Sequence, residues 1–202
     1  MGKIVVNTNM TLDGVMQAPA GPDEDPRGGF EHGGWATPYF DQVMAEQAGQ
    51  GIAQGGAFLF GRRTYEHFAS VWPHQPDDDT FAKVLNGRMK YVASRTLGEP
   101  LEWRNSTLLK GDAAEAVAAL RLQEEKDLVI LGSGELIRSL MPHGLIDEYR
   151  LLIHPLVLGS GRRLFTDDGT FATLQLVDTT TTTTGVVIAT YVPGEPPAPQ
   201  PA

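Results

Sequence analysis

The sequence has no cysteine among its 202 residues. This absence excludes disulfide scaffolds, thiolate zinc sites, iron–sulfur clusters and cysteine nucleophiles. Any reduction that the protein performs must therefore be carried by a bound cofactor. Long apolar runs are also missing: no stretch approaches the roughly 18 apolar residues of a membrane-spanning helix, and no secretory signal precedes the first strand-like segment. We expect a cytoplasmic protein without a membrane partner.

Positive charge is scarce. Sixteen Lys and Arg residues face 25 Asp and Glu residues, which gives a formal net charge of −9. Such a surface repels polyanions, so nonspecific nucleic-acid binding is not expected. The five histidines show no spacing typical of metal ligands, and we expect no metal site. Hydrophobic residues make up 41% of the chain, enough for a packed core, and the composition excludes a wholly disordered protein.

The length fits one domain, which we place at residues 1–192. Residues 193–202 contain five prolines and little to bury, and they predict a Pro-rich flexible tail. Apolar, β-branched runs predict strands at 3–10, 57–60, 89–93, 108–109, 128–131 and 149–154, and a hairpin at 174–182 and 186–192. Helical patterns are expected at 37–49, from residue 62 onward, and at 77–85, 112–125 and 135–141.

This alternation predicts an α/β protein with a mostly parallel central sheet and an antiparallel C-terminal hairpin. Thr37 and Asp112 are the expected N-caps of two of the helices. The segment 18–34 is rich in glycine, proline and acidic residues and predicts a long lid or binding loop. Its acidic residues disfavour an anionic substrate nearby.

Three predicted strands end in small or basic residues that open the next segment. These are Gly61-Arg62-Arg63-Thr64, Ser94-Arg95-Thr96 and Gly132-Ser133-Gly134-Glu135. Ligands of open α/β sheets bind at the carboxyl ends of strands, where helix N-termini and arginines suit phosphates. The three segments together predict an extended ligand with several phosphates. The Gly-Ser-Gly turn is not a complete GxGxxG fingerprint, because Ile137 stands at its sixth position.

At these segments the sequence resembles the dihydrofolate-reductase-like superfamily, and within it the reductase (C-terminal) domain of the riboflavin-biosynthesis deaminase–reductase. The similar segments are 6–14, 61–66, 92–96, 130–136 and 145–165, in the family's order. The resemblance implies a three-layer αβα sandwich, NADPH as cofactor and a homodimer, for which the terminal hairpin would supply the interface. No deaminase domain is present, so only the reductase activity is implied.

The resemblance also implies site residues. The cofactor phosphates would be held by Gly61, Arg62, Arg63 and Thr64, and the 2′-phosphate ribose by Ser94 and Arg95. The pyrophosphate and the nicotinamide side would be wrapped by Gly132, Ser133, Gly134, Glu135 and Leu136.

The catalytic side of the site is open to several interpretations. Asp13 and Tyr65 are the candidate catalytic residues, as proton donors beside a bound water. Asp13 equally fits a residue that holds the Leu-Asp-Gly turn, and Tyr65 fits a core residue. Asp41 is the nearest acidic residue on the first predicted helix, and Arg162 and Arg163 fit either a phosphate site or a solvated loop.

Two functions follow. The first is an NADPH-dependent reductase that transfers a hydride to a small heterocyclic substrate, such as a pyrimidine or a pterin. The second is a nucleotide- or flavin-binding protein of the same fold without catalysis.

Overall fold

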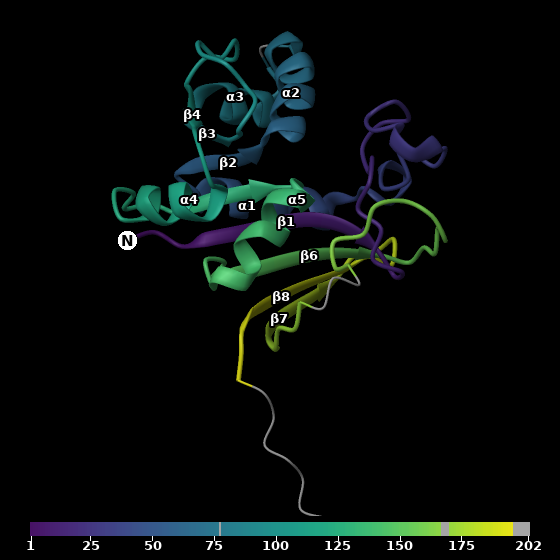
Figure 1. The fold of residues 1–202 in the computed structure, drawn as a ribbon. Coiled ribbons are helices and arrows are strands. Elements are labelled where there is room, and N and C mark those ends of the chain that lie inside the picture. Colours follow the sequence, from purple (N-terminus) through teal and green to yellow (C-terminus); the bar gives the residue numbers. More distant parts are fainter. Residues whose placement is uncertain (77, 167–169, 196–202) are drawn as a thin grey trace, which may run out of the picture.

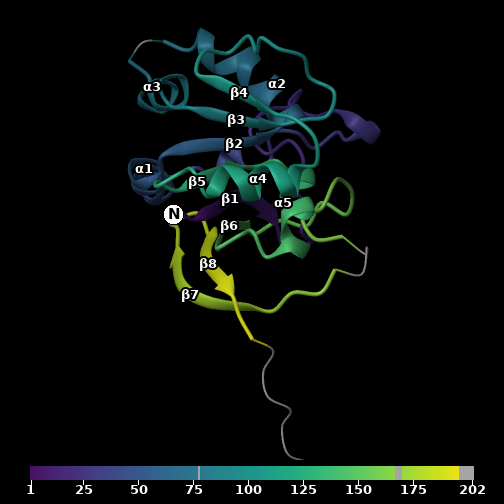
Figure 2. The ribbon, with the colours of Figure 1, turned by 60° about the vertical axis from the view of Figure 1, so that its left-hand side comes forward.

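A central sheet of eight strands carries helices on both faces (Figures 1 and 2). The computed structural model describes residues 1–76, 78–166 and 170–195. The strands are β1 (Ile4–Thr11), β2 (Ala57–Gly61), β3 (Lys90–Ala93), β4 (Ser106–Leu109), β5 (Leu128–Leu131), β6 (Glu148–His154), β7 (Leu174–Thr181) and β8 (Val187–Pro193). The helices are α1 (Gln42–Gln54), α2 (Arg62–Val71), α3 (Thr80–Gly87), α4 (Ala113–Arg121) and α5 (Gly134–Leu140).

The sheet order is β4-β3-β2-β5-β1-β6-β8-β7. The first six strands in this order pair in parallel, and β8 joins β6 and β7 in antiparallel fashion. This confirms the predicted three-layer αβα architecture with its antiparallel C-terminal hairpin. None of the helices in the described ranges is long and apolar enough to cross a lipid bilayer.

Two cores lie on opposite faces of the sheet because successive strand residues point in opposite directions. On β2, Leu59 packs into the core that α4 and α5 cover. Phe58 and Phe60 point to the other face and pack with residues of α2 and α3. The side chains of Phe58, Leu59 and Phe60 are fully buried.

Several element boundaries differ from the prediction. Asp112 does cap α4, accepting from the backbone N–H groups of Ala114 (2.9 Å) and Glu115 (3.1 Å), but the helix ends at Arg121. The expected helix at 37–49 is instead a short 3₁₀ turn followed by α1. Phe40 is extended between the two, and Asp41, rather than Thr37, accepts a hydrogen bond from the first turn of α1, from Met44 N–H (2.9 Å).

The strand β7 forms one edge of the sheet, and its Leu176 and Val177 are about half exposed. An apolar edge of this kind suits the expected dimer interface, and the homodimer stays a prediction. The flexible tail was placed from residue 193, but Pro193 still pairs with Leu174 at the end of β8. The backbone N–H of Gly194 donates to the carbonyl oxygen of Thr173 over 2.9 Å, and residues 196–202 of that tail lie outside the described residues.

Candidate functional site

The carboxyl ends of β2 and β5 meet, as the sequence predicted. These strands are neighbours in the sheet, and the backbone N–H of Gly61 donates to Ser133 Oγ over 3.1 Å. Next to them, the N–H of Gly132 donates to the carbonyl oxygen of Asn7 on β1 over 3.2 Å. Segments 72 residues apart in the chain are thereby locked together at one edge of the sheet.

The turn after β5 has an unusual backbone. Gly132 has φ +62°, and Ser133 is left-handed with φ 56° and ψ 47°. A left-handed conformation costs a residue with a Cβ about 1–2 kcal/mol, and such strain is found most often at functional sites. The hydrogen bond from Gly61 holds the Ser133 side chain in place, so the strained turn is part of the contact between the two strand ends.

Arg62 joins the ends of β2 and β3. Its Nη1 donates to Thr96 Oγ1 (2.6 Å), and its Nε donates to Glu66 Oε1 (2.8 Å). The loop that carries Thr96 is held by Ser94, whose Oγ accepts from the N–H groups of Thr96 and Leu97, each at 3.1 Å. Arg95 lies on this loop and is exposed. The structure therefore places Arg62 against the loop that carries Ser94 and Arg95.

The N-terminus of α2 is open. Gly61 is the N-cap, and none of the described side chains caps the first backbone N–H groups of this helix. Thr64, in its first turn, is half-buried. Free N–H groups at a helix N-terminus beside an arginine suit a phosphate. These residues fit the phosphates of a dinucleotide cofactor.

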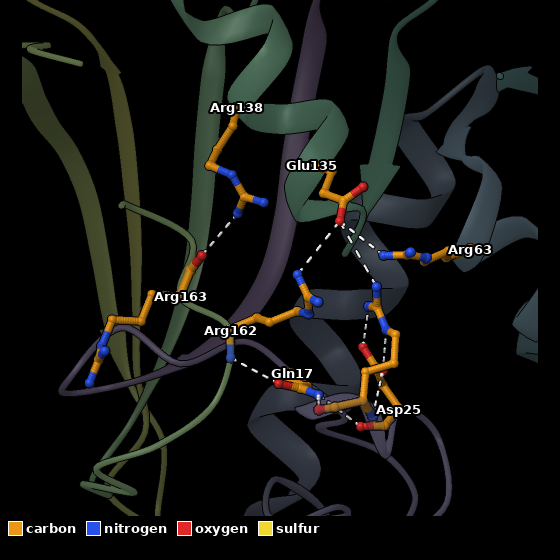
Figure 3. A network of polar contacts seen from close by, with 8 residues as sticks. Gln17, Asp25, Arg63, Glu135, Arg138, Arg162 and Arg163 are labelled. Carbon is orange, nitrogen blue, oxygen red and sulfur yellow. Dashed lines mark hydrogen bonds and ion pairs between the residues drawn. The ribbon is translucent and has the colours of Figure 1, made fainter. Parts of the chain in front are cut away.

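The carboxylate of Glu135 lies close to three arginine side chains (Figure 3). Its Oε1 lies 3.0 Å from Arg63 Nη1, 3.7 Å from Arg162 Nη1 and 3.9 Å from Arg27 Nη1. Arg63 and Glu135 were both predicted to hold the cofactor, and here they pair with each other. The next predicted residue, Leu136, has its side chain in the main core, so only its backbone could face a ligand.

Gln17 is a functional candidate that the sequence did not reveal. It is buried, and its Nε2 donates to the carbonyl oxygens of Asp25 and Arg27, each over 2.9 Å. Its Oε1 accepts from the backbone N–H of Arg162 over 2.9 Å. It thus ties the 18–34 loop to the loop after β6. A polar residue in a Gly/Pro-rich stretch gives no sequence signal of burial, since its partners lie far away in the chain.

A cavity of about 250 Å³ lies between these two loops. Its lining includes Gln17, Arg27, Phe30, Gly161 and Arg162. Arg162 was one of the open candidates for a phosphate site, whereas Arg27 was not singled out because the loop around it is acidic.

Asp13 holds a turn through hydrogen bonds to its carboxylate. Its carboxylate accepts from Thr11 Oγ1 (2.6 Å) and from the backbone N–H groups of Leu158 (3.2 Å) and Gly159 (2.9 Å). The Thr11 hydrogen bond, with those of the two N–H groups, lowers the pKa of Asp13 to about 2. The carboxylate is therefore ionised at neutral pH and holds the turn, which was the second interpretation of this residue.

We expect Asp13→Ala to lower the free energy of unfolding by about 2 kcal/mol, because hydrogen bonds to a charged acceptor contribute about 1.5–3 kcal/mol and their donors are left unpaired. Chemical denaturation measures this loss. Asp23→Ala, an exposed change in the next loop, is the control and should stay within about 0.5 kcal/mol of the parent protein. Equal stability of the two variants would contradict the role of Asp13.

The other two candidate acids are also engaged in structure. Tyr65 is buried beside the ring of Trp103, and its hydroxyl accepts from the backbone N–H of Trp103 over 3.0 Å, so it is the core residue that one interpretation expected. Asp41 Oδ2 accepts from the Oγ1 (2.6 Å) and N–H (2.7 Å) of Thr183. These bonds, with that from Met44, lower the pKa of Asp41.

Within the described ranges, no three His, Asp or Glu side chains are placed to share a metal ion.

Comparison with known proteins places this geometry in a family. Residues 2–188 match the model of the RibD C-terminal domain. The uncharacterized protein YyaP of Bacillus subtilis (strain 168) is 30% identical over 196 residues, which span 94% of each chain. A second uncharacterized protein of the same organism, YwjB, is 29% identical over 107 residues, 53% of this chain and 56% of its own.

Two solved structures share the fold. A putative riboflavin biosynthesis protein from Shewanella sp. PV-4 superposes with a TM-score of 0.67 at 21% identity, covering 96% of this chain and 100% of its own. A pyrimidine reductase-like protein from Corynebacterium diphtheriae gives a TM-score of 0.66 at 14% identity, covering 96% of this chain and 93% of its own.

Proposed function

Because the chain belongs to the family of the RibD C-terminal domain, we propose that it is a reductase that binds NADPH and reduces a small heterocyclic substrate of the pyrimidine or pterin kind. The observation that carries the proposal is the meeting of three strand ends at one edge of the sheet. There, the open N-terminus of α2 and the pair of Arg62 with the 94–96 loop offer donors for several phosphates.

The chain's own residues bind and orient in this proposal. When bound, a reduced nicotinamide would supply the hydride for a C=N or C=O carbon of the substrate. The Gly61–Ser133 contact fixes the strand ends against which the cofactor would lie, and the 18–34 loop, tied down by Gln17, excludes water. The nitrogen or oxygen of the substrate double bond also needs a proton once the carbon has received the hydride. Asp13 and Asp41 are ionised and Tyr65 is buried, so we assign the proton to a bound water.

The alternative is a nucleotide-binding protein without catalysis. The same engagement of Asp13, Asp41 and Tyr65 favours it, because no acid among these candidates is free to serve a substrate. Oxidation of NADPH against a panel of pyrimidines, pterins, flavins and imines separates the two functions. Binding without oxidation of NADPH by any member of the panel would support the alternative.

We expect Arg62→Ala and Arg95→Ala each to raise the Kd for NADPH about tenfold, since a charge-assisted hydrogen bond to phosphate contributes about 1.5–3 kcal/mol. The preference over NADH should fall in Arg95→Ala, because Arg95 faces the 2′-phosphate in our assignment, whereas Arg62 faces the other cofactor phosphates. Fluorescence titration measures both affinities, with Lys83→Ala on α3 as an exposed cationic control. Unchanged NADPH affinity and preference in both arginine variants would refute the assignment.

A further inference from the structure

Three guanidinium groups from three separate segments converge on one carboxylate oxygen. Arg27 lies in the long N-terminal loop, Arg63 in the first turn of α2, and Arg162 in the loop after β6. All three reach toward Oε1 of Glu135, and Figure 3 shows Arg63 and Arg162 approaching it from different sides. Because these segments are far apart in the chain, the three arginines come together only when the loops fold against the helices.

The cluster has more positive than negative charge. Asp25 is the second carboxylate of the group, and it pairs with Arg27 through two hydrogen bonds. Burial of Asp25 is outweighed by these bonds, so its pKa is lowered and it stays charged. Three guanidinium groups thus face two carboxylates, on a protein whose formal net charge is −9. A local positive excess on so acidic a chain favours an anion at this place.

Glu135 does not pair with all the N–H donors of Arg27, Arg63 and Arg162. Only Arg63 lies within hydrogen-bond distance of its oxygen, because 3.7 Å and 3.9 Å are too long for the other two. Arg27 Nη1 is buried and has no hydrogen-bond partner among the described residues. The guanidinium of Arg162 likewise makes no hydrogen bond within the described ranges.

The cluster is also accessible. The side chains of Arg63, Arg162 and Glu135 are each about half exposed or more. Arg27 and Arg162 line the cavity of about 250 Å³ between the two loops, which is large enough for a small anion. Exposed ion pairs contribute little to stability, so Glu135 can leave its position at low cost.

We propose that Arg27, Arg63 and Arg162 form a binding site for a phosphate group, in which the carboxylate of Glu135 holds the arginines together until the ligand arrives. A carboxylate oxygen offers one point to three cations. A phosphate offers three oxygens in a tetrahedral arrangement and a second negative charge, so each guanidinium can make its own short hydrogen bonds.

Arg63 and Glu135 of this site are also assigned to the cofactor in the proposed function, but phosphate binding can be measured without the reductase activity. Two sources supply the same chemistry: the diphosphate of a dinucleotide cofactor, or a phosphate carried by the substrate. If the source is the cofactor, the inference adds to the proposed function, because Arg63 and Glu135 adjoin the open end of α2.

The test uses calorimetric titration of the purified full chain with inorganic phosphate at low ionic strength. We expect Arg162→Gln to weaken phosphate binding about five- to tenfold, as the loss of a charged donor implies. We expect Glu135→Gln to strengthen it by a similar factor, because the competing carboxylate is removed. Arg63→Gln repeats the first test on a regular helix, should the loop variant fail to fold.

Arg138→Gln is the matched control. Arg138 lies on α5 close to the cluster, but its Nη1 donates to the carbonyl oxygen of Arg163 and not to Glu135 (Figure 3). It changes the net charge by the same amount as Arg162→Gln. The proposal is overturned if this control weakens phosphate binding as much as Arg162→Gln does, or if Glu135→Gln does not strengthen it.

NADPH titrations of the same variants distinguish the two sources. If the cofactor supplies the phosphate, NADPH competes with inorganic phosphate and Arg162→Gln raises the Kd for NADPH. If the substrate supplies it, phosphate and NADPH bind together and the Kd for NADPH is unchanged. Failure of the parent protein to bind NADPH would refute the proposed function, while phosphate binding would still support this site.

Discussion

Lys90→Ala is expected to lower the free energy of unfolding by about 3 kcal/mol. Lys90 begins β3 and is fully buried. Its Nζ donates to the carbonyl oxygens of Leu85 (2.8 Å) and Arg88 (2.7 Å), which end α3, and it lies 4.4 Å from the centre of the Trp103 ring.

The loss has two physical parts. Alanine leaves the two carbonyl oxygens without their donor, at about 1–3 kcal/mol for a buried group. It also opens a cavity where the lysine stem packed. A part of this loss is returned, because a buried charge is removed: burial, and then the charge of Arg104, lowers the pKa of Lys90 to about 8. The amine is still mainly protonated at pH 7.

Urea denaturation of Lys90→Ala at pH 7 measures the change. Lys90→Met is the matched variant, since it keeps most of the stem and should recover the cavity part of the loss but not the hydrogen bonds. Lys83→Ala, an exposed position on α3, should be nearly neutral. A loss below about 1 kcal/mol for Lys90→Ala would show that the carbonyl oxygens find other partners.

Acidification is expected to destabilise the protein through His154 by about 3 kcal/mol between pH 6.5 and pH 4. This side chain ends β6, is fully buried, and contacts the rings of Trp35 and Tyr39 edge-on. Its Nε2 lies 2.9 Å from Asn9 Oδ1, an acceptor, so the neutral ring carries its proton on Nε2. Nδ1 is buried and has no partner among the described residues.

Burial lowers the pKa of His154 from 6.5 to about 4. A second proton would sit on Nδ1, where no acceptor awaits it. In the unfolded chain the ring takes up this proton near pH 6.5, so the unfolded state binds more protons than the folded state over the interval. Stability is therefore complete above pH 6.5 and is lost as the pH falls toward 4.

The measurement is the free energy of unfolding of the parent and of His154→Gln at several pH values from 7.5 to about 4. Glutamine can still donate to Asn9 but does not titrate, so the curve of the variant should be flatter by the stated amount, whatever its stability at pH 7.5. Parallel curves for the two proteins would mean that His154 does not carry the acid sensitivity.

The fold was largely predictable because its signals are local. Apolar β-branched runs followed by small or basic helix starts appear at β2 and β5, and the alternation of strands and helices implies a parallel sheet. The errors lie at boundaries, where tertiary contacts decide. One oxygen of Asp41 caps the first turn of α1, and its other oxygen accepts from Thr183 in the β7–β8 turn, 142 residues away.

The candidate site was predictable only in its residues, and not in their partners. Arg62, Ser94 and Gly132 were predicted together because parallel strands place their carboxyl ends at one edge. The sequence did not show that Arg63 faces Glu135, nor that Asp13 is held ionised by Thr11 and by the loop after β6. Each of these contacts depends on which loops pack against each other in the folded protein. The spacing of residues along the chain does not determine this packing.

What the amino-acid sequence by itself determined is the exclusion of cysteine chemistry, the layered α/β architecture and the group of residues at one edge of the sheet that we propose to bind phosphate. Composition and short-range periodicity suffice for these. Only the tertiary structure decided that Lys90, His154 and Gln17 are buried and that three arginines surround Glu135. Burial and charge pairing depend on residues distant in the chain, and it is their free energy of desolvation that sets which groups are charged, paired or free to bind.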